Sequence, residues 1–315
     1  MIRYILKRLL WMIPTVLGVV ILVFTLLYFT PGDPAEIIAG DTATPEQIEE
    51  TRVRLGLDQS YIVQLGNYLE SVIIHHDFGT SYLDHSDVGA QLAERFPRTF
   101  ILSMVTMIIA VVFGVPLGII AAVKQDTIGD RLSMFLALLG IAIPNFWLAL
   151  LLILLFSVNL GWLPAMGFST PAHYILPSLA GSLFGISFQA RQSRSSMLEV
   201  IRSDFMTTAR SKGISEMRVI IRHGMQNAMI PILTVAGGLF ASMMGGSLIL
   251  EQIFSIPGIG SYIITAVGNR DYPIIRSGSL VLAVAFGIVM LIVDLLYACV
   301  DPRIRAQYSK KGAKR

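Results

Sequence analysis

The sequence predicts an all-α integral membrane protein with about six transmembrane helices. Three observations indicate this fold class. Of the 315 residues, 54% are hydrophobic and only 14% are charged, whereas soluble domains carry roughly 25% charged residues. The mean hydropathy is strongly positive, at +0.68. Uncharged runs of spanning length recur along the chain, and a transmembrane helix needs about 20 apolar residues because no water satisfies backbone groups in the hydrocarbon core.

The first predicted span lies in an N-terminal transmembrane region, residues 1–30. Its apolar run Leu9–Phe29 has 21 residues without a charge. A signal-peptide core has only about 7–15 residues and ends at a small-residue cleavage site. This run instead ends in Thr30-Pro31-Gly32-Asp33-Pro34, so we expect the helix to be retained.

Five further spans are predicted downstream. The longest uncharged run, Leu132–Ala190, has 59 residues and exceeds one helix, so the turn-rich patch Asn159–Pro171 is expected to divide it. The last span contains Asp294, for which we favour a structural pair with a neighbouring arginine or backbone group over a functional role. The predicted spans lie in Thr99–Val123, in the two parts of Leu132–Ala190, in Gly224–Leu250 and in Ser277–Val300.

The distribution of lysine and arginine predicts the orientation, because cytoplasmic loops retain positive charge. With the N-terminus inside, the predicted cytoplasmic segments hold 18 of the 24 basic residues. The opposite orientation would translocate most of them. Both termini are therefore expected in the cytoplasm, which agrees with an even number of spans. These segments are Met1–Arg8, Lys124–Arg131, Arg191–Arg222 and Asp301–Arg315.

Residues 31–98 are predicted to form an external subdomain between the first two helices. The segment carries 12 acidic and 4 basic side chains. Two stretches, Pro45–Leu55 and Tyr61–Ile74, have the composition of amphipathic helices. The segment is either a docking surface for another protein or a solvated connector, and loop composition does not distinguish the two. Residues 99–315 are expected to form the remaining core, with a cytoplasmic loop at 191–228.

The cytoplasmic loop has a regular pattern. Gly213 interrupts a predicted helix, and Ser215-Glu216-Met217 is expected to begin a second one. An apolar stripe on such an element must be buried by its own bundle or by a partner protein. The residues of the first stripe, at helical spacing, are Met197, Val200, Ile201, Phe205 and Ala209.

Residues 207–231, TTARSKGISEMRVIIRHGMQNAMIP, resemble the cytoplasmic coupling loop of binding-protein-dependent ABC importer permeases. Ala209 and Gly213 keep the family pattern, whereas Thr207 and Thr208 replace its Glu-Ala. This departure is similar to the dipeptide, oligopeptide and nickel branch, whose loop reads Thr-Ala-Arg-Ala-Lys-Gly. Gln226 departs from the arginine of that branch, which puts an obligatory ionic contact there in doubt.

Further landmarks of that family keep their order along almost the whole chain. The long loop after the first helix also resembles the first of the two permease subunits in such systems. The resemblance implies a type I ABC-importer permease fold. The landmarks are PGDP at 31–34, LGLDQ at 55–59, DFG at 77–79, IPNFW at 143–147, LGWLPAMG at 160–167, RSSML at 194–198, EQIFSIPGIG at 251–260, RDYP at 270–273 and DPRIR at 301–305.

The resemblance implies one permease half of an importer for dipeptides or oligopeptides, in a bacterial or archaeal inner membrane. Nickel or another small solute such as glutathione remains an alternative. The sequence lacks a GxxxxGK[ST] phosphate loop, so we expect no catalytic residue and a separate cytoplasmic ATPase. The other implied partners are a second permease, an extracytoplasmic binding protein and membrane lipid. We expect neither a cofactor nor nucleic acid.

The resemblance also assigns candidate site residues. Gly213 would supply a sharp reversal where the loop docks on the ATPase. A candidate external gate lies at Glu251, Pro257 and Gly258, although Glu251 is equally interpreted as an interfacial side chain in water. His75-His76-Asp77 lacks a further ligand at suitable spacing, so no metal site is predicted. A stand-alone channel or receptor is the alternative from another class. The coupling residues are Thr207, Thr208, Ala209, Arg210, Ser211, Lys212, Gly213 and Glu216.

Overall fold

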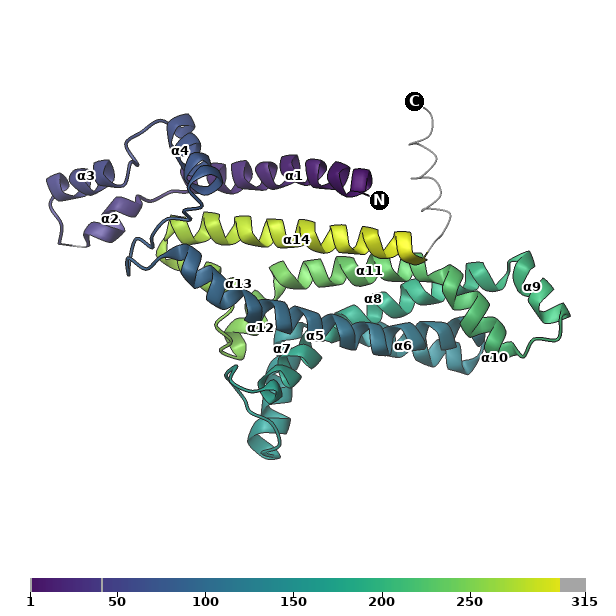
Figure 1. Cartoon of the computed structure of the whole chain (residues 1–315). Helices are drawn as coiled ribbons and strands as arrows, with labels where there is room; N and C mark the ends of the chain where they lie inside the picture. Colours follow the sequence, from purple (N-terminus) through teal and green to yellow (C-terminus); the bar gives the residue numbers. More distant parts are fainter. Residues whose placement is uncertain (1, 41, 301–315) are drawn as a thin grey trace, which may run out of the picture.

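The computed structural model describes residues 2–40 and 42–300, and this part of the chain is almost wholly helical (Figure 1). DPRIR and the basic tail lie outside the described residues. The helices are α1 (Ile2–Phe29), α2 (Pro34–Ala39), α3 (Pro45–Arg54), α4 (Tyr61–Ile74), α5 (Val88–Val123), α6 (Ile128–Ala142), α7 (Asn145–Leu152), α8 (Ile175–Ile201), α9 (Asp204–Ser211), α10 (Glu216–Arg218), α11 (Met225–Gly246), α12 (Leu248–Ile253), α13 (Ile259–Asn269) and α14 (Tyr272–Val300). Short π- or 3₁₀-helical turns are Ile153–Asn159, Pro171–Tyr174 and Val219–Gly224.

In the described part of the chain, four helices are long and apolar enough to span a membrane and one bent pair makes a fifth span, against the six spans that the sequence predicts. The four helices lie within α1, α5, the continuous run from α10 to α11, and α14. The bent pair is α6 with α7. That pair is bent by 96° because Pro144 lacks an N–H and disfavours a helical Ile143. The sixth helix, α8, has 27 residues. It is less hydrophobic than the other spans because it is rich in glycine and serine and contains Gln189. Most of these small and polar residues are buried.

Small residues bring α5 and α8 together along much of their length. A Cβ added at Gly114 would lie 2.7 Å from the Ile186 carbonyl oxygen, and one at Gly185 would lie 2.8 Å from Ala110 Cβ. Such approaches leave no room for side chains. The glycine pairs Gly114/Gly118 and Gly181/Gly185, each spaced by four residues, therefore lie where the helices pack closely. This contact positions α8 at the centre of the bundle.

Ion pairs tie helix ends that are distant in the sequence. Arg194 on α8 reaches Asp130 on α6 through two hydrogen bonds of 2.8 and 2.7 Å. Asp294 on α14 lies 2.9 Å from Arg8 on α1. The pairing with a neighbouring arginine that we favoured for Asp294 is confirmed. It also holds α1 against α14, which run side by side in Figure 1.

Residues 30–40 and 42–87 form a helical cap at one end of the bundle. The expected stretches Pro45–Leu55 and Tyr61–Ile74 correspond to α3 and α4. Thr44 begins α3 with a capping box to Gln47. The hydroxyls of Tyr61 and Thr25 lie 2.8 Å apart, which fixes α4 to α1. Helix α5 begins at Val88, inside the segment predicted to be external.

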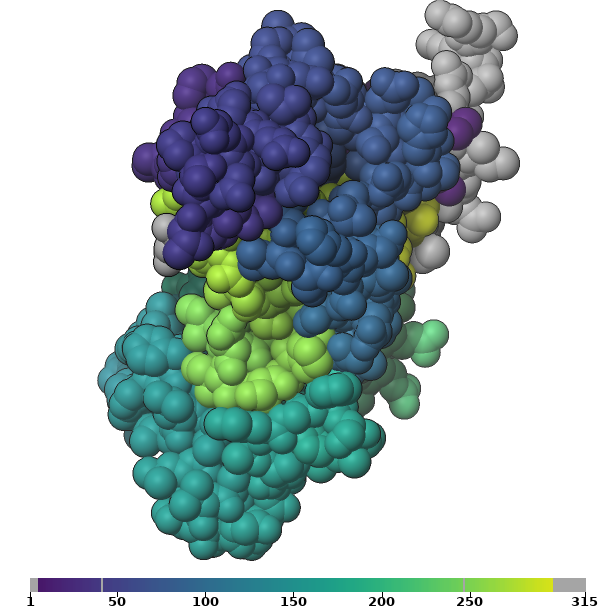
Figure 2. All heavy atoms as spheres, turned by 90° about the vertical axis from the view of Figure 1, so that its left-hand side faces the viewer, coloured from purple at the N-terminus to yellow at the C-terminus, as the bar shows by residue number. Residues whose placement is uncertain are grey.

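The cap is anchored on the turn between α13 and α14. Asp271, which is buried, accepts hydrogen bonds from Ser81 Oγ at 2.6 Å and from the Tyr82 N–H at 3.2 Å. Ser277 Oγ donates to the Phe78 carbonyl at 2.9 Å. DFG and RDYP, nearly two hundred residues apart, are therefore adjacent. In Figure 2, which faces this end, yellow-green atoms of the α12–α14 region lie between the blue cap and the teal helices.

Candidate functional site

The end of the molecule opposite the cap carries a helix–glycine–helix element, which we call the α9–α10 hairpin (Asp204–Arg218; Figure 1). Helix α9 stops at Ser211, and Gly213 has a φ of +73°. Glycine adopts this left-handed conformation at no steric cost. The Gly213 N–H donates to the Arg210 carbonyl at 2.9 Å. Gly213 therefore supplies the reversal that the sequence predicts.

An ion pair closes the α9–α10 hairpin. Arg210 Nη2 lies 2.9 Å from Glu216 Oε1, and Arg210 Nε lies 3.1 Å from Glu216 Oε2. The hydrogen bond from Arg210 holds the pKa of the Glu216 carboxyl below its ordinary value. Both side chains are partly exposed, so solvent screens the pair. It aligns the two arms but stabilises the chain little.

The α9–α10 hairpin buries one face and exposes another. Met206, Ala209 and Val219 form a small buried cluster between its arms. Phe205 is 43% exposed and Met217 is 69% exposed. Contrary to the expected stripe, Phe205 points outward while Ala209 points inward. Of the other predicted coupling residues, Thr207, Thr208, Ser211 and Lys212 are exposed, so the α9–α10 hairpin presents both polar and apolar side chains.

The Arg210–Glu216 pair gives a pH-dependent prediction. A carboxyl with a depressed folded pKa contributes stability above its unfolded pKa and loses it as pH falls through the folded pKa. Glu216→Gln is expected to lower the free energy of unfolding by about 0.5 kcal/mol at pH 7, and by nothing measurable at acidic pH. Thermal unfolding of the detergent-solubilised chain measures this. The exposed Glu50→Gln is the control, and an equal loss at both pH values would contradict the assignment.

Glu251 is buried in a hydrogen-bonded network at the cap end, which corrects the interpretation of an interfacial side chain in water. Its carboxylate is fully buried. Thr99 Oγ1 donates to it at 2.7 Å, Ser247 Oγ at 2.9 Å and the Ser261 N–H at 2.8 Å. Thr99 Oγ1 in turn accepts from the Ile259 N–H at 2.9 Å. The carboxylate thus ties α5, α12 and the start of α13 together.

The other two candidate gate residues lie in the same turn. A Cβ added at Gly258 would lie 2.5 Å from both Glu251 carboxylate oxygens, so only glycine allows the carboxylate this approach. The Pro257 carbonyl accepts a hydrogen bond from Arg98 Nη1 at 3.1 Å. The structure therefore brings Glu251, Pro257 and Gly258 into one cluster. Thr99 and Arg98, both at the start of a predicted span, were not foreseen as its partners.

The architecture defines the class of protein. It is similar to a solved structure of the MetNI methionine ABC transporter in inward-facing conformations, with a TM-score of 0.57 and 17% sequence identity, over 67% of this chain and 96% of that chain. This likeness concerns the fold alone. The expected type I ABC-importer permease fold is confirmed.

Family comparison then identifies the family. A family model described as a binding-protein-dependent transport system inner membrane component matches residues 114–306. The N-terminal model of the same kind of membrane component matches residues 1–104. The chain belongs to this family of importer permeases, and it is a multi-pass membrane permease subunit.

Individual relatives extend over almost the whole chain. The glutathione transport system permease protein GsiC of Salmonella typhimurium is 45% identical over 305 residues, which are 97% of this chain and 99% of that protein. The permease of the same name from Escherichia coli K12 is 44% identical over the same length. Membership of the importer family replaces the alternative of a stand-alone channel or receptor.

Proposed function

We propose that this chain forms one half of the translocation path of an ATP-driven importer of peptide-like solutes. The observation that carries the proposal is the α9–α10 hairpin, which projects from the bundle and exposes Phe205 and Met217 among polar side chains. Exposed apolar side chains inside a polar rim are typical of protein-binding surfaces. Because the chain has no phosphate loop of its own, the protein that binds this surface would be a separate ATPase.

The proposed topology places the α9–α10 hairpin and both termini in the cytoplasm and the cap outside. Charge supports this orientation, because basic residues are concentrated in the segments assigned to the inside. Helices α1 and α14 cross the bundle in opposite directions (Figure 1). The cap, with its excess of acidic side chains, would then face the extracytoplasmic binding protein.

The proposed coupling surface comprises Thr207 to Gly213 together with Glu216. Its geometry suits coupled movement, because the buried cluster packs the two arms together and the ion pair aligns them. The second arm continues without interruption through residues 219–224 into α11. A displacement of the α9–α10 hairpin by the ATPase would therefore move α11. Alternating access requires helices of one permease to move in this coordinated way relative to the second permease.

The proposed external gate is the cluster around Glu251, Pro257 and Gly258. A buried carboxylate with three hydrogen-bond donors holds α12 and α13 in one arrangement. Movement of α11, which precedes α12 by a single residue, would strain this network. The cluster is thus placed to respond when the α9–α10 hairpin moves.

For the substrate, we propose small peptides of the size of glutathione. The support is the name of the relatives, which are glutathione transport permeases, and glutathione is itself a tripeptide. Dipeptides and oligopeptides fall in the same chemical class. Nickel has no comparable support among the relatives described above.

The test is co-purification in mild detergent with the proteins encoded beside this chain, followed by an ATPase assay. Gly213→Pro fixes φ near −65° and removes the N–H that donates to Arg210. We expect the variant to retain at least tenfold less ATPase, with the remaining ATPase activity insensitive to solute.

The matched control is Gly161→Pro, a change at another exposed glycine with positive φ, +64°, outside the α9–α10 hairpin. It is expected to leave ATPase retention unchanged. If the wild type purifies alone, or if both variants behave alike, the coupling role of the α9–α10 hairpin is wrong.

A further inference from the structure

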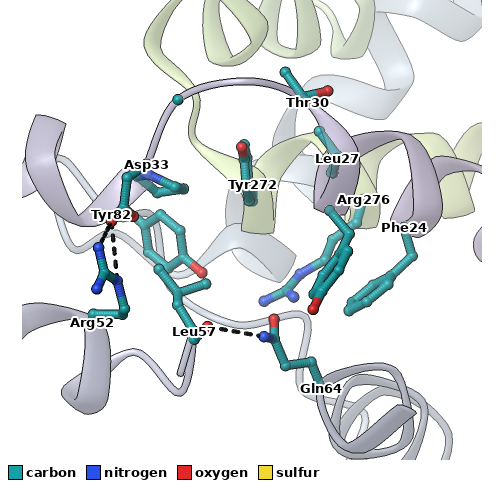
Figure 3. Close-up of a pocket in the computed structure, with 13 residues that line it drawn as sticks. Phe24, Leu27, Thr30, Asp33, Arg52, Leu57, Gln64, Tyr82, Tyr272 and Arg276 are labelled. Atoms are coloured by element: carbon teal, nitrogen blue, oxygen red, sulfur yellow. Dashed lines mark hydrogen bonds and ion pairs between the residues drawn. The ribbon is translucent and has the colours of Figure 1, made fainter. Parts of the chain in front are cut away.

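Three of the family landmarks meet at one cavity beneath the cap. The cavity has a volume of about 360 Å³ and lies where α1 ends and α14 begins (Figure 3). PGDP contributes Gly32, Asp33 and Pro34, LGLDQ contributes Leu57, and RDYP contributes Tyr272. Tyr82, just after DFG, completes the set. These motifs are far apart in sequence, so their convergence on one space indicates a binding site rather than local turn chemistry.

Arg276 is the central polar group of this cavity. In Figure 3 its guanidinium points into the space between Tyr82 and Gln64. Its Nε is buried and has no hydrogen-bond partner, and within the described part of the chain Arg276 forms no ion pair. Its guanidinium carbon lies 4.7 Å from the centre of the Tyr68 ring. The ring holds the guanidinium in place without neutralising its charge.

The other charged side chains that line the cavity, Asp33 and Arg52, are paired with each other. Arg52 binds Asp33 through Nε at 3.1 Å and through Nη2, which leaves Asp33 occupied by an arginine other than Arg276. Gln64 Nε2 donates to the Leu57 and Gln59 carbonyls. Among the described residues that line the cavity, Arg276 is therefore the charged side chain with no opposite charge bound to it. A partly buried guanidinium without a carboxylate is the group that an oxyanion best satisfies.

The walls suit a small molecule with an apolar part. Aromatic rings of Phe24, Tyr28, Tyr82 and Tyr272 line the space. A second cavity of about 400 Å³ adjoins it and shares Arg276, Tyr82, Leu57 and Gln64 as walls. Ligand pockets fall in the range of roughly 300–1,000 Å³ and combine apolar walls with a few polar groups. Burial raises the pKa of Tyr82, so its hydroxyl remains a hydrogen-bond donor at neutral pH.

We propose that this cavity is a binding site for an oxyanion, in which the Arg276 guanidinium binds a carboxylate or phosphate group and the aromatic rings cover the adjoining apolar part. The site lies at the end of the bundle assigned to the outside and is separate from the coupling and gate clusters. The oxyanion comes either from a solute carboxylate or from the phosphate of a phospholipid. Both sources reach the end of a membrane helix, and they share the chemistry that Arg276 recognises.

Binding to the full chain, with any co-purifying subunits, in dodecyl maltoside tests the proposal. The solute arm titrates the delipidated protein with dialanine and with dialanine amide, which lacks the carboxylate. The lipid arm measures retained phospholipid by native mass spectrometry before delipidation. We expect one arm to be positive, and the positive arm identifies the source. Arg276→Gln is expected to weaken that binding at least tenfold, and Arg276→Lys less, since lysine keeps the charge but not the planar donor pair.

The matched control is Arg95→Gln. The Arg95 guanidinium also covers a tyrosine ring, at 4.3 Å from the centre of Tyr262, but Arg95 does not line the cavity. It is expected to leave binding unchanged, which separates loss of the site from loss of a cation–π contact. If Arg276→Gln fails to fold, Tyr82→Phe keeps the ring, removes the hydroxyl and is expected to weaken binding about threefold.

Two results would overturn the proposal. In the first, the wild type does not distinguish dialanine from its amide and retains no phospholipid. In the second, binding occurs but is equal in wild type, Arg276→Gln and Tyr82→Phe, which would place it elsewhere. Neither result depends on ATPase coupling, so failure here is distinguishable from failure of the proposed function.

Discussion

Replacing Gly118 with valine is expected to destabilise the bundle by about 3 kcal/mol, at the upper end for overpacked cores. A Cβ at this position would meet the Ala190 carbonyl oxygen and would lie 2.6 Å from Ser193 Cβ. The obstacle includes the α8 backbone, which cannot rotate aside as a flexible side chain would. Valine adds two methyl groups beyond this Cβ, so α5 and α8 must separate.

The loss of stability is measured as the fall in apparent melting temperature of the detergent-solubilised chain. The melting is monitored as the fraction of protein that stays monodisperse on gel filtration after heating. Gly238→Val in α11 is the matched control, because nothing lies within 4 Å of a Cβ built there. It is expected to cost nothing measurable, because valine is no worse a helix former than the glycine it replaces. Equal losses in the two variants would show that the α5–α8 contact is not the cause.

The general arrangement of the bundle was predictable because the bilayer imposes a simple rule on composition. A run such as Leu9–Phe29 has no alternative to a spanning helix, since unpaired backbone groups are costly in hydrocarbon. The rule weakens at α8, whose glycines and Gln189 face other helices rather than lipid. It is also silent on α12 and α13, because the predicted span Gly224–Leu250 ends inside α12 and α13 lies between two predicted spans.

The candidate site was predictable only in part. Gly213 and the reversal that it makes could be predicted, because a positive φ has a strong residue preference. The burial of Glu251 could not, because its partners come from α5 and α13 and only the tertiary fold unites them. Arg276 was overlooked because it precedes the predicted span at Ser277, where an arginine ordinarily reaches water. A charge beside both a span and a cluster of aromatic residues is the signal that could have found it.

Glu251→Ala is expected to cost about 4 kcal/mol, because it removes the acceptor of three buried donors at once. Each unsatisfied buried group costs about 1–3 kcal/mol. Ser247 Oγ can turn to another acceptor, whereas the Ser261 N–H is fixed by the backbone of α13. Glu251→Gln keeps one carbonyl acceptor but presents its amide N–H₂ to a donor, so we expect about half the loss.

The same two variants separate a gate from a structural tie when the assembled transporter is reconstituted in vesicles. A structural tie alone predicts that transport and ATPase activity fall together with the amount of folded protein. A gate predicts that, per folded complex, Glu251→Gln hydrolyses ATP near the wild-type rate while solute uptake falls at least tenfold. Glu70→Ala, which removes an exposed carboxylate on α4 at the same end, is the control for lost charge. Proportional loss in Glu251→Gln would remove the gate and leave the carboxylate as the tie between α5, α12 and α13.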